Sequence, residues 1–269
     1  MKVYLLILLI ALTCQQIFLS DGKEEERDQL LIEYKVLNTP RENTVLSYPK
    51  QLSNNKKHGV VLWCPGYANK AGDYELIIRR LASHGFVVVG LGTSQGDGTN
   101  ATQALNWIDE KNRDSSHPLF GKLDMDKIGC SGHSLGGIEC ERAIVADSRI
   151  KTFIINNAGD WDHKNMALVD RSKPIAIVYG SNETERQYAE ADYGNQTVKA
   201  PACLIMMEGE DYGHISGPWD GMAATVAWFR WHLGGAINRK ADFVGTHGKY
   251  INFPIVGHKG NWKGVCKNF

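Results

Sequence analysis

The sequence predicts an α/β domain in which a mostly parallel sheet is covered by helices on both faces. Short apolar runs alternate with stretches of helical periodicity from residue 59 onward. The apolar runs are nearly continuous, as in Phe86–Val89, which is typical of strands that are buried on both sides. No internal repeat and no Pro/Ser-rich linker divides the chain, so a single domain is expected.

The expected elements follow one another in a regular order. Strands are predicted at Leu30–Leu37, Thr44–Tyr48, Gly59–Trp63, Phe86–Leu91, Lys127–Cys130, Thr152–Asn156, Pro174–Tyr179 and Ala202–Met207. Helices are predicted at Tyr74–His84, Thr99–Lys111, Leu135–Ala146 and Ala223–Leu233. The first two strands flank a turn at 38–43 and form an antiparallel hairpin, whereas the later ones are separated by helices and are expected to be parallel. For residues 238–269 a satellite hairpin, a surface-adhering segment and a flexible end all remain open.

Composition narrows the class of protein. The chain has 269 residues, with 30 basic and 30 acidic side chains and 43% hydrophobic residues. A dedicated nucleic-acid binder would carry a basic excess, and a disordered chain would have fewer apolar residues, so neither class is expected. We expect a monomer that binds no nucleic acid.

The N-terminus has the pattern of a secretory signal peptide. Lys2 precedes the apolar stretch Val3–Leu12, and a polar and charged run follows at Ser20–Asp28. The apolar stretch is shorter than the ~20 residues of a membrane-spanning helix. We therefore expect a signal peptide at 1–20 and a secreted domain at 21–269 without membrane insertion, the alternatives being an uncleaved anchor or a buried helix.

An oxidising compartment changes how the cysteines are interpreted. Cys14 lies in the expected signal peptide, so an odd number of cysteines remains and at least one thiol stays free or pairs between chains. Cys64, Cys130 and Cys203 lie at or near the ends of apolar runs and are expected to behave as small buried hydrophobes. Cys266 is expected in a disulfide, with Cys203 as the suggested partner. No Cys or Cys/His spacing suggests a metal site.

A candidate nucleophile lies between an expected strand and an expected helix. Gly132-His133-Ser134-Leu135-Gly136 has the form G-x-S-x-G in the strand–turn–helix context of a nucleophile elbow. Ser134 is the predicted nucleophile, and the backbone N–H of Leu135 is a predicted oxyanion donor. The alternative is a structural turn with a solvated serine.

The second oxyanion donor is expected after an earlier strand. Gly59–Trp63 leads into Cys64-Pro65-Gly66-Tyr67, where glycine permits close backbone approach and the N–H of Tyr67 is the candidate. An ordinary Pro-Gly turn is the alternative.

A serine nucleophile needs a general base that an acid orients. His214 follows the last predicted strand, Ala202–Met207, where the base belongs in this chain order, whereas His133 is interpreted as a neighbour of Ser134.

The acid is less sharply defined by the sequence. Glu183 follows the strand Pro174–Tyr179 and is the first choice, with Glu185 and Asp160 as alternatives. Asn182 begins one of the N-glycosylation sequons, which lie at Asn100, Asn182 and Asn195. Either Asn182 is unmodified in a buried loop or the acid lies elsewhere.

Several stretches resemble the cutinase-type polyester hydrolases, the lid-less enzymes that include polyethylene-terephthalate hydrolases and are related to dienelactone-hydrolase-like esterases. The resemblance runs from about residue 34 to about residue 232. It is carried by Gly66-Tyr67, Arg79–Gly90, Gly132–Gly137 and Val226–Trp231. It implies an α/β-hydrolase fold with eight to nine strands, no large lid, a shallow cleft and no cofactor. It also implies the roles given above for Ser134, His214, Tyr67 and Leu135, and it makes Trp161 an aromatic wall for the acyl group. Glu183 stands where that family has Asp.

Together these features predict a secreted serine ester hydrolase that acts through an acyl-enzyme, on cutin-like polyesters or on short-to-medium acyl esters, polymeric or small. A lipase, a general carboxylesterase or a peptidase on the same fold is the first alternative. A catalytically inactive secreted binding protein is the second. No metal and no nucleotide is required by this chemistry.

Overall fold

The computed structural model describes residues 30–37 and 43–269. The signal peptide expected at 1–20 and most of the turn expected at 38–43 lie outside these described residues. The signal peptide therefore stays a prediction.

The described residues form a ten-stranded sheet in the order β1-β2-β4-β3-β5-β6-β7-β8-β10-β9. The strands are β1 (Ile32–Leu37), β2 (Thr44–Pro49), β3 (His58–Cys64), β4 (Val87–Gly90), β5 (Leu123–His133), β6 (Ile150–Asn156), β7 (Ile175–Gly180), β8 (Ala202–Glu208), β9 (Asn252–Pro254) and β10 (Asn261–Lys267). The run from β4 to β8 is parallel, while β1, β2, β9 and β10 pair antiparallel at the two edges. The predicted α/β fold with a mostly parallel sheet is confirmed, with ten strands where the resemblance implied eight to nine.

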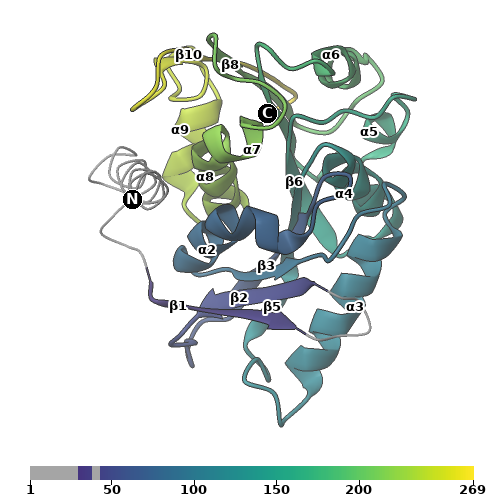
Figure 1. The fold of residues 1–269 in the computed structure, drawn as a ribbon, viewed down its shortest axis with the longest axis vertical. Helices are drawn as coiled ribbons and strands as arrows, with labels where there is room; N and C mark the ends of the chain where they lie inside the picture. Colours follow the sequence, from purple (N-terminus) through teal and green to yellow (C-terminus); the bar gives the residue numbers. More distant parts are fainter. Residues whose placement is uncertain (1–29, 38–42) are drawn as a thin grey trace, which may run out of the picture.

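Helices cover both faces of the sheet, as predicted (Figure 1). On one face, α2 (Glu75–Ser83) and α8 (Met222–His232) pack on strand residues such as Val61. On the other, α3 (Thr99–Arg113) and α4 (Leu135–Ala146) pack on Val60 and Leu62. Successive strand side chains point to opposite faces, so a continuous apolar strand supplies both cores. No helix among residues 30–37 and 43–269 is long and apolar enough to cross a membrane.

Several short segments were not expected from the sequence. They are η2 (Ala71–Tyr74), α5 (Asn165–Leu168), α6 (Arg186–Gly194), α7 (Gly217–Asp220), η3 (Ile237–Arg239) and α9 (Lys240–Phe243). All but α6 have three or four residues, too few to show an apolar period, and α6 buries only Ala189 and Asp192.

The C-terminal residues belong to the main sheet, which none of the three options for 238–269 anticipated. Strand β10 pairs antiparallel with β8 over its whole length, and β9 pairs with β10. Trp262 of β10 is 2% exposed and packs on Tyr250 and Met207 in the core beneath α8. Phe243 and Tyr250 of the same segment are buried in that core as well, and the burial of these three aromatic side chains favours docking of the segment on the sheet.

The cysteines form two disulfides, one expected and one not. Cys203 and Cys266 lie opposite each other on β8 and β10 and are joined, as suggested. Cys130, expected to be an unpaired hydrophobe, is instead bonded to Cys140, which is a correction. The elbow turns α4 back over β5, so two cysteines ten residues apart come within 5.5 Å between Cα atoms. Cys64 is free and buried, as expected.

Candidate active site

The predicted site residues lie on loops that leave the carboxyl ends of five neighbouring parallel strands. Strand β3 precedes Tyr67, β5 precedes Ser134, β6 precedes Trp161, β7 precedes Glu183 and β8 precedes His214. Carboxyl ends of parallel strands meet at one edge of a sheet, which is where ligands bind in open α/β folds. The topology therefore gathers all of these loops on one side of the molecule.

The turn at Ser134 has the conformation that an elbow requires. Its backbone has φ 52° and ψ −123°, a strained combination for a residue other than glycine. A Cβ at Gly136 would lie 2.0 Å from the carbonyl oxygen of Cys64, and one at Gly132 would lie 2.4 Å from that of Gly136. Only glycine fits at both positions, and Ser134 is held between β5 and the N-terminus of α4.

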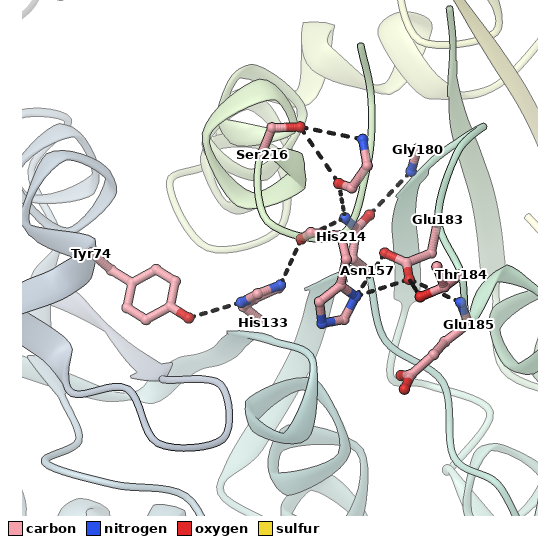
Figure 2. Close-up of polar contacts among 10 residues, drawn as sticks. Tyr74, His133, Asn157, Gly180, Glu183, Thr184, Glu185, His214 and Ser216 are labelled. Atoms are coloured by element: carbon pink, nitrogen blue, oxygen red, sulfur yellow. Dashed lines mark hydrogen bonds and ion pairs between the residues drawn. The ribbon is translucent and has the colours of Figure 1, made fainter. Parts of the chain in front are cut away.

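His214 and Glu183 form a close pair (Figure 2). Nδ1 of His214 lies 2.8 Å and 2.9 Å from the two carboxylate oxygens of Glu183, whose side chain is 1% exposed. The backbone N–H of Glu185 also donates to Glu183, at 2.9 Å. Burial by itself would raise the pKa of Glu183, but these hydrogen bonds outweigh it and leave that pKa below its ordinary value. The hydrogen bond to Glu183 in turn raises the pKa of His214.

Neither of the other candidate acids makes a hydrogen bond or ion pair with His214 in the part of the chain that the structure describes. Asp160 accepts two hydrogen bonds from Arg142, at 3.1 Å and 2.9 Å, and a third from Asn165. The Glu185 side chain is exposed and makes no hydrogen bond or ion pair with any residue of the described ranges. Of the three acids considered, Glu183 is the one that contacts the histidine.

The conflict between the acid and the sequon at Asn182 is resolved by side-chain direction. Asn182 is exposed, and its amide donates to the carbonyl oxygen of Glu210, whereas the neighbouring Glu183 carboxylate is buried. An exposed asparagine and a buried acid can therefore be neighbours in sequence. Asn100 is 9% exposed, and the Asn195 amide donates to the His163 carbonyl oxygen at 3.1 Å.

Not every predicted contact is present. The hydroxyl of Ser134 makes no hydrogen bond to His214 in the described part of the chain. Within the same ranges, the N–H groups of Tyr67 and Leu135 donate to no protein acceptor. Tyr67 lies on the loop after β3 and Leu135 is the first residue of α4, both at the same sheet edge as Ser134, so these N–H groups remain available to a ligand.

The surface around the site exposes apolar side chains. Tyr67 is 81% exposed, Trp161 57% and Ile215 75%. A hollow of about 530 Å³ opens beside His214 and is lined by Ile215, Trp219, Asp211 and others. Large exposed apolar side chains near a hollow favour contact with an apolar ligand.

Asn157 has a role in the site that sequence reasoning missed. Its amide nitrogen donates to the carbonyl oxygens of Gly213 and His214, at 2.7 Å and 3.0 Å. Its amide oxygen accepts from the N–H of Gly180, at 3.1 Å. It thereby ties the end of β7 to the histidine loop. An isolated asparagine after a strand gives no signal of this in the sequence.

The described residues bring three metal-ligand side chains together at one place, Cys64, Cys130 and Cys140. Two of these sulfurs are bonded to each other, so the cluster offers a metal no set of thiolates.

The fold, the elbow and the histidine–carboxylate pair together define an α/β-hydrolase-type chain, with a serine after β5, a glutamate after β7 and a histidine after β8. The family model described as "PETase: PET hydrolase-like" matches residues 43–244, about three quarters of the chain. The chain belongs to this PET hydrolase-like family.

Curated relatives agree with this membership. The chain is 31% identical over 141 residues to Cutinase est2 of Thermobifida alba, a match that covers 51% of this chain and 45% of the relative. It is 32% identical over 94 residues to Cutinase 2 of Thermobifida cellulosilytica, which covers 34% of each. The chain thus spans less than half the length of the curated relatives that it matches.

Proposed function

We propose that the protein hydrolyses carboxylic esters by two-step acyl transfer. Ser134 is the nucleophile, His214 the general base and Glu183 the acid that orients the histidine. The observation that carries this proposal is the contact of both buried Glu183 oxygens with Nδ1 of His214, whose backbone is hydrogen-bonded to His133, the residue before the strained serine. A carboxylate there accepts the Nδ1 proton and leaves Nε2 as the basic nitrogen.

The steps follow from these roles. Nε2 of His214 takes the proton of Ser134 as the serine oxygen attacks the ester carbonyl, and a tetrahedral oxyanion forms. The imidazolium then protonates the leaving alcohol, which gives the acyl-enzyme. Water, deprotonated by His214, attacks the acyl carbonyl, and the collapse of the second intermediate releases the acid and restores the serine.

The oxyanion receives hydrogen bonds from the N–H groups of Tyr67 and Leu135. Leu135 is the first residue of α4, where the helix dipole also favours negative charge. Loss of one such donor typically costs about 3–4 kcal/mol of transition-state stabilisation.

The substrate class follows from the relatives and the surface. Both relatives described above carry the name cutinase, and the open site exposes Tyr67, Trp161 and Ile215. We infer that the substrate is an apolar ester, either a polyester or an ester of short-to-medium acyl length. We also infer that no metal or organic cofactor takes part. The extracellular location belongs to the same proposal.

Replacement of the nucleophile tests the proposed function. The Ser134→Ala variant is expected to lose about 10⁶-fold in kcat on a chromogenic short-chain ester, because no other group attacks the carbonyl as rapidly. Ser148→Ala, an exposed serine just beyond the other end of α4, is the matched control and is expected to retain wild-type turnover. Unchanged turnover by Ser134→Ala would reject the assignment.

A second measurement separates the rival functions. An organophosphonate should add one phosphonyl group to Ser134, detected by peptide mass spectrometry. Turnover of esters of increasing acyl length, compared with that of amides, distinguishes a polyester hydrolase from a lipase or a peptidase. A protein that neither reacts with the phosphonate nor hydrolyses any ester would be an inactive binding protein.

A further inference from the structure

A chain of hydrogen bonds connects three parts of the site through His133, and Figure 2 shows the two of them that His133 itself makes, to Tyr74 and to His214. The N–H of Gly66 donates to the hydroxyl oxygen of Tyr74, at 3.1 Å. That oxygen lies 2.8 Å from Nδ1 of His133. Nε2 of His133 lies 2.9 Å from the backbone carbonyl oxygen of His214. The side chains of Tyr74 and His133 are buried, at 1% and 4% exposure, so water does not compete for these bonds.

The direction of each bond follows from the chemistry of its partners. A carbonyl oxygen can only accept, so Nε2 of His133 carries a proton. Burial, followed by the charge of His214, lowers the pKa of His133 to about 4, and its ring is neutral near pH 7. Nδ1 is then an acceptor, and the single hydroxyl proton of Tyr74 goes to it at 2.8 Å rather than to the more distant Oδ1 of Asn69 at 3.4 Å, while the hydroxyl oxygen accepts from Gly66. One tautomer of His133 therefore satisfies the whole chain.

We propose that His133 and Tyr74 are positioning residues. They fix the positions of the His214 backbone and of the oxyanion loop at Gly66-Tyr67 relative to Ser134. This inference rests on the proposed function and deepens it. His133 precedes the nucleophile directly, and Gly66 precedes the N–H donor Tyr67 directly. The chain of bonds thus joins Gly66, the neighbour of the oxyanion donor, and His133, the neighbour of the nucleophile, to the backbone of His214, the base. Misplacement of a catalytic group by about 1 Å can cost about 100-fold in rate.

The neutral state of His133 also suits the reaction. Its ring centroid lies 4.8 Å from that of His214, which becomes an imidazolium in each half of the cycle. A charged His133 would repel this imidazolium and raise the barrier. The groups that face His133 are the Tyr74 hydroxyl, the ring and carbonyl of His214 and the negative charge of Glu183.

The first test removes a single hydroxyl. Tyr74→Phe keeps the ring that stacks on Trp219, at 5.4 Å between centroids, and deletes the oxygen that links Gly66 to His133. We expect kcat to fall about 10- to 100-fold with KM within about threefold of wild type. The matched control is Tyr212→Phe, which removes a buried hydroxyl without a hydrogen-bond partner in the described ranges, two residues before His214. This control is expected to keep wild-type kcat.

The second test asks for rescue by a conservative variant. His133→Gln places an amide N–H where Nε2 donates to the carbonyl of His214, whereas His133→Met has a similar length and no donor. We expect the glutamine variant to recover at least about tenfold in kcat over the methionine variant. Melting temperatures of all variants, measured at the same pH, show that each one is folded under assay conditions.

The rate constant of Ser134 phosphonylation separates this proposal from the proposed function. If the wild-type protein does not react, the proposed function fails. If it reacts and Tyr74→Phe reacts more slowly by the factor seen in kcat, the positioning role is supported. A Tyr74→Phe variant as fast as wild type, equal rates for the two His133 variants, or a rise in KM at unchanged kcat overturns the positioning role.

Discussion

Glu183 touches His214 with both carboxylate oxygens, and this contact determines the direction in which both pKa values move. The hydrogen bond that Nδ1 of His214 donates to the carboxylate raises the pKa of His214 above its ordinary value of 6.5. In its proposed role as general base His214 acts only when neutral, so activity is expected to fall as the pH falls through this raised value. A glutamate takes the place that the resembled family gives to aspartate, and its longer side chain still reaches the histidine.

Replacement of this acid tests the assignment through a pH profile. In Glu183→Gln the charge that stabilises the imidazolium is lost, so the pKa of His214 falls and the acid limb of kcat/KM moves to lower pH. Turnover itself is expected to drop about 10⁴-fold, as when a triad carboxylate becomes an amide. The profile is measured on a chromogenic ester, with Glu185→Gln as the control for an exposed charge nearby. An acid limb that stays in place would reject Glu183 as the partner.

Helix α4 carries two buried glutamates whose environments differ. Glu139 accepts backbone hydrogen bonds from Gln95, Gly96 and Ala101. Burial, followed by the charges of Asp192 and Asp160, raises the pKa of Glu141 well above its ordinary value. The pKa of Asp192 is likewise raised, to about 6. Because the folded state favours the protonated form of these two carboxyls, their contribution to stability is fully present below their unfolded pKa values and is lost as the pH rises through the raised ones.

This contrast predicts opposite effects of the same substitution on one helix. Glu141→Gln removes a charge that the core opposes and is expected to raise Tm at pH 8 by at least about 2 °C, the shift that 1 kcal/mol produces in a chain of this size. Glu139→Gln weakens a satisfied acceptor and is expected to lower Tm. Calorimetry at pH 5 and pH 8 measures both, and the gain from Glu141→Gln should shrink at pH 5. A Glu141→Gln variant that melts below wild type at pH 8 would contradict the assignment.

Strand β10 is joined to β8 by the Cys203–Cys266 disulfide, which closes a loop of 63 residues, whereas Cys130–Cys140 closes one of 10. Loop-closure entropy predicts a loss of about 4 kcal/mol when the first is replaced by two alanines and about 3 kcal/mol for the second. Denaturant unfolding of each double variant measures the two losses. A larger loss for Cys130–Cys140 would show that packing beneath the elbow outweighs chain entropy.

The charge of the chain sets its behaviour toward substrates. Thirty acidic and thirty basic residues balance, so long-range attraction or repulsion of a neutral ester is not expected. We predict that kcat/KM on a neutral ester changes less than about twofold between low and high salt, since there is little steering to screen. An ester that carries a positive charge at its alcohol provides the comparison. A strong salt dependence with the neutral ester would indicate a local field that the overall balance conceals.

Local patterns in the sequence were sufficient for the α/β fold, for the elbow at Ser134 and for the position of His214. Apolar periodicity and the strand–turn–helix context depend on residues close together in the chain, so they are readable without a structure. Even so, only the geometry distinguishes Glu183 from Glu185 and Asp160, because the decisive contact spans 31 residues.

The remaining features were decided by tertiary structure alone. The Cys130–Cys140 bond depends on how α4 folds back over β5, and the docking of β10 depends on a partner strand and on the burial of Trp262. The chain of bonds through His133 joins Tyr74 to a residue 59 positions away and then to the carbonyl of His214. Such contacts depend on burial and on side-chain direction. Residues close together in the sequence determine the apolar period of a strand or a helix. They do not determine which side chains become buried against distant parts of the chain or in which direction those side chains point.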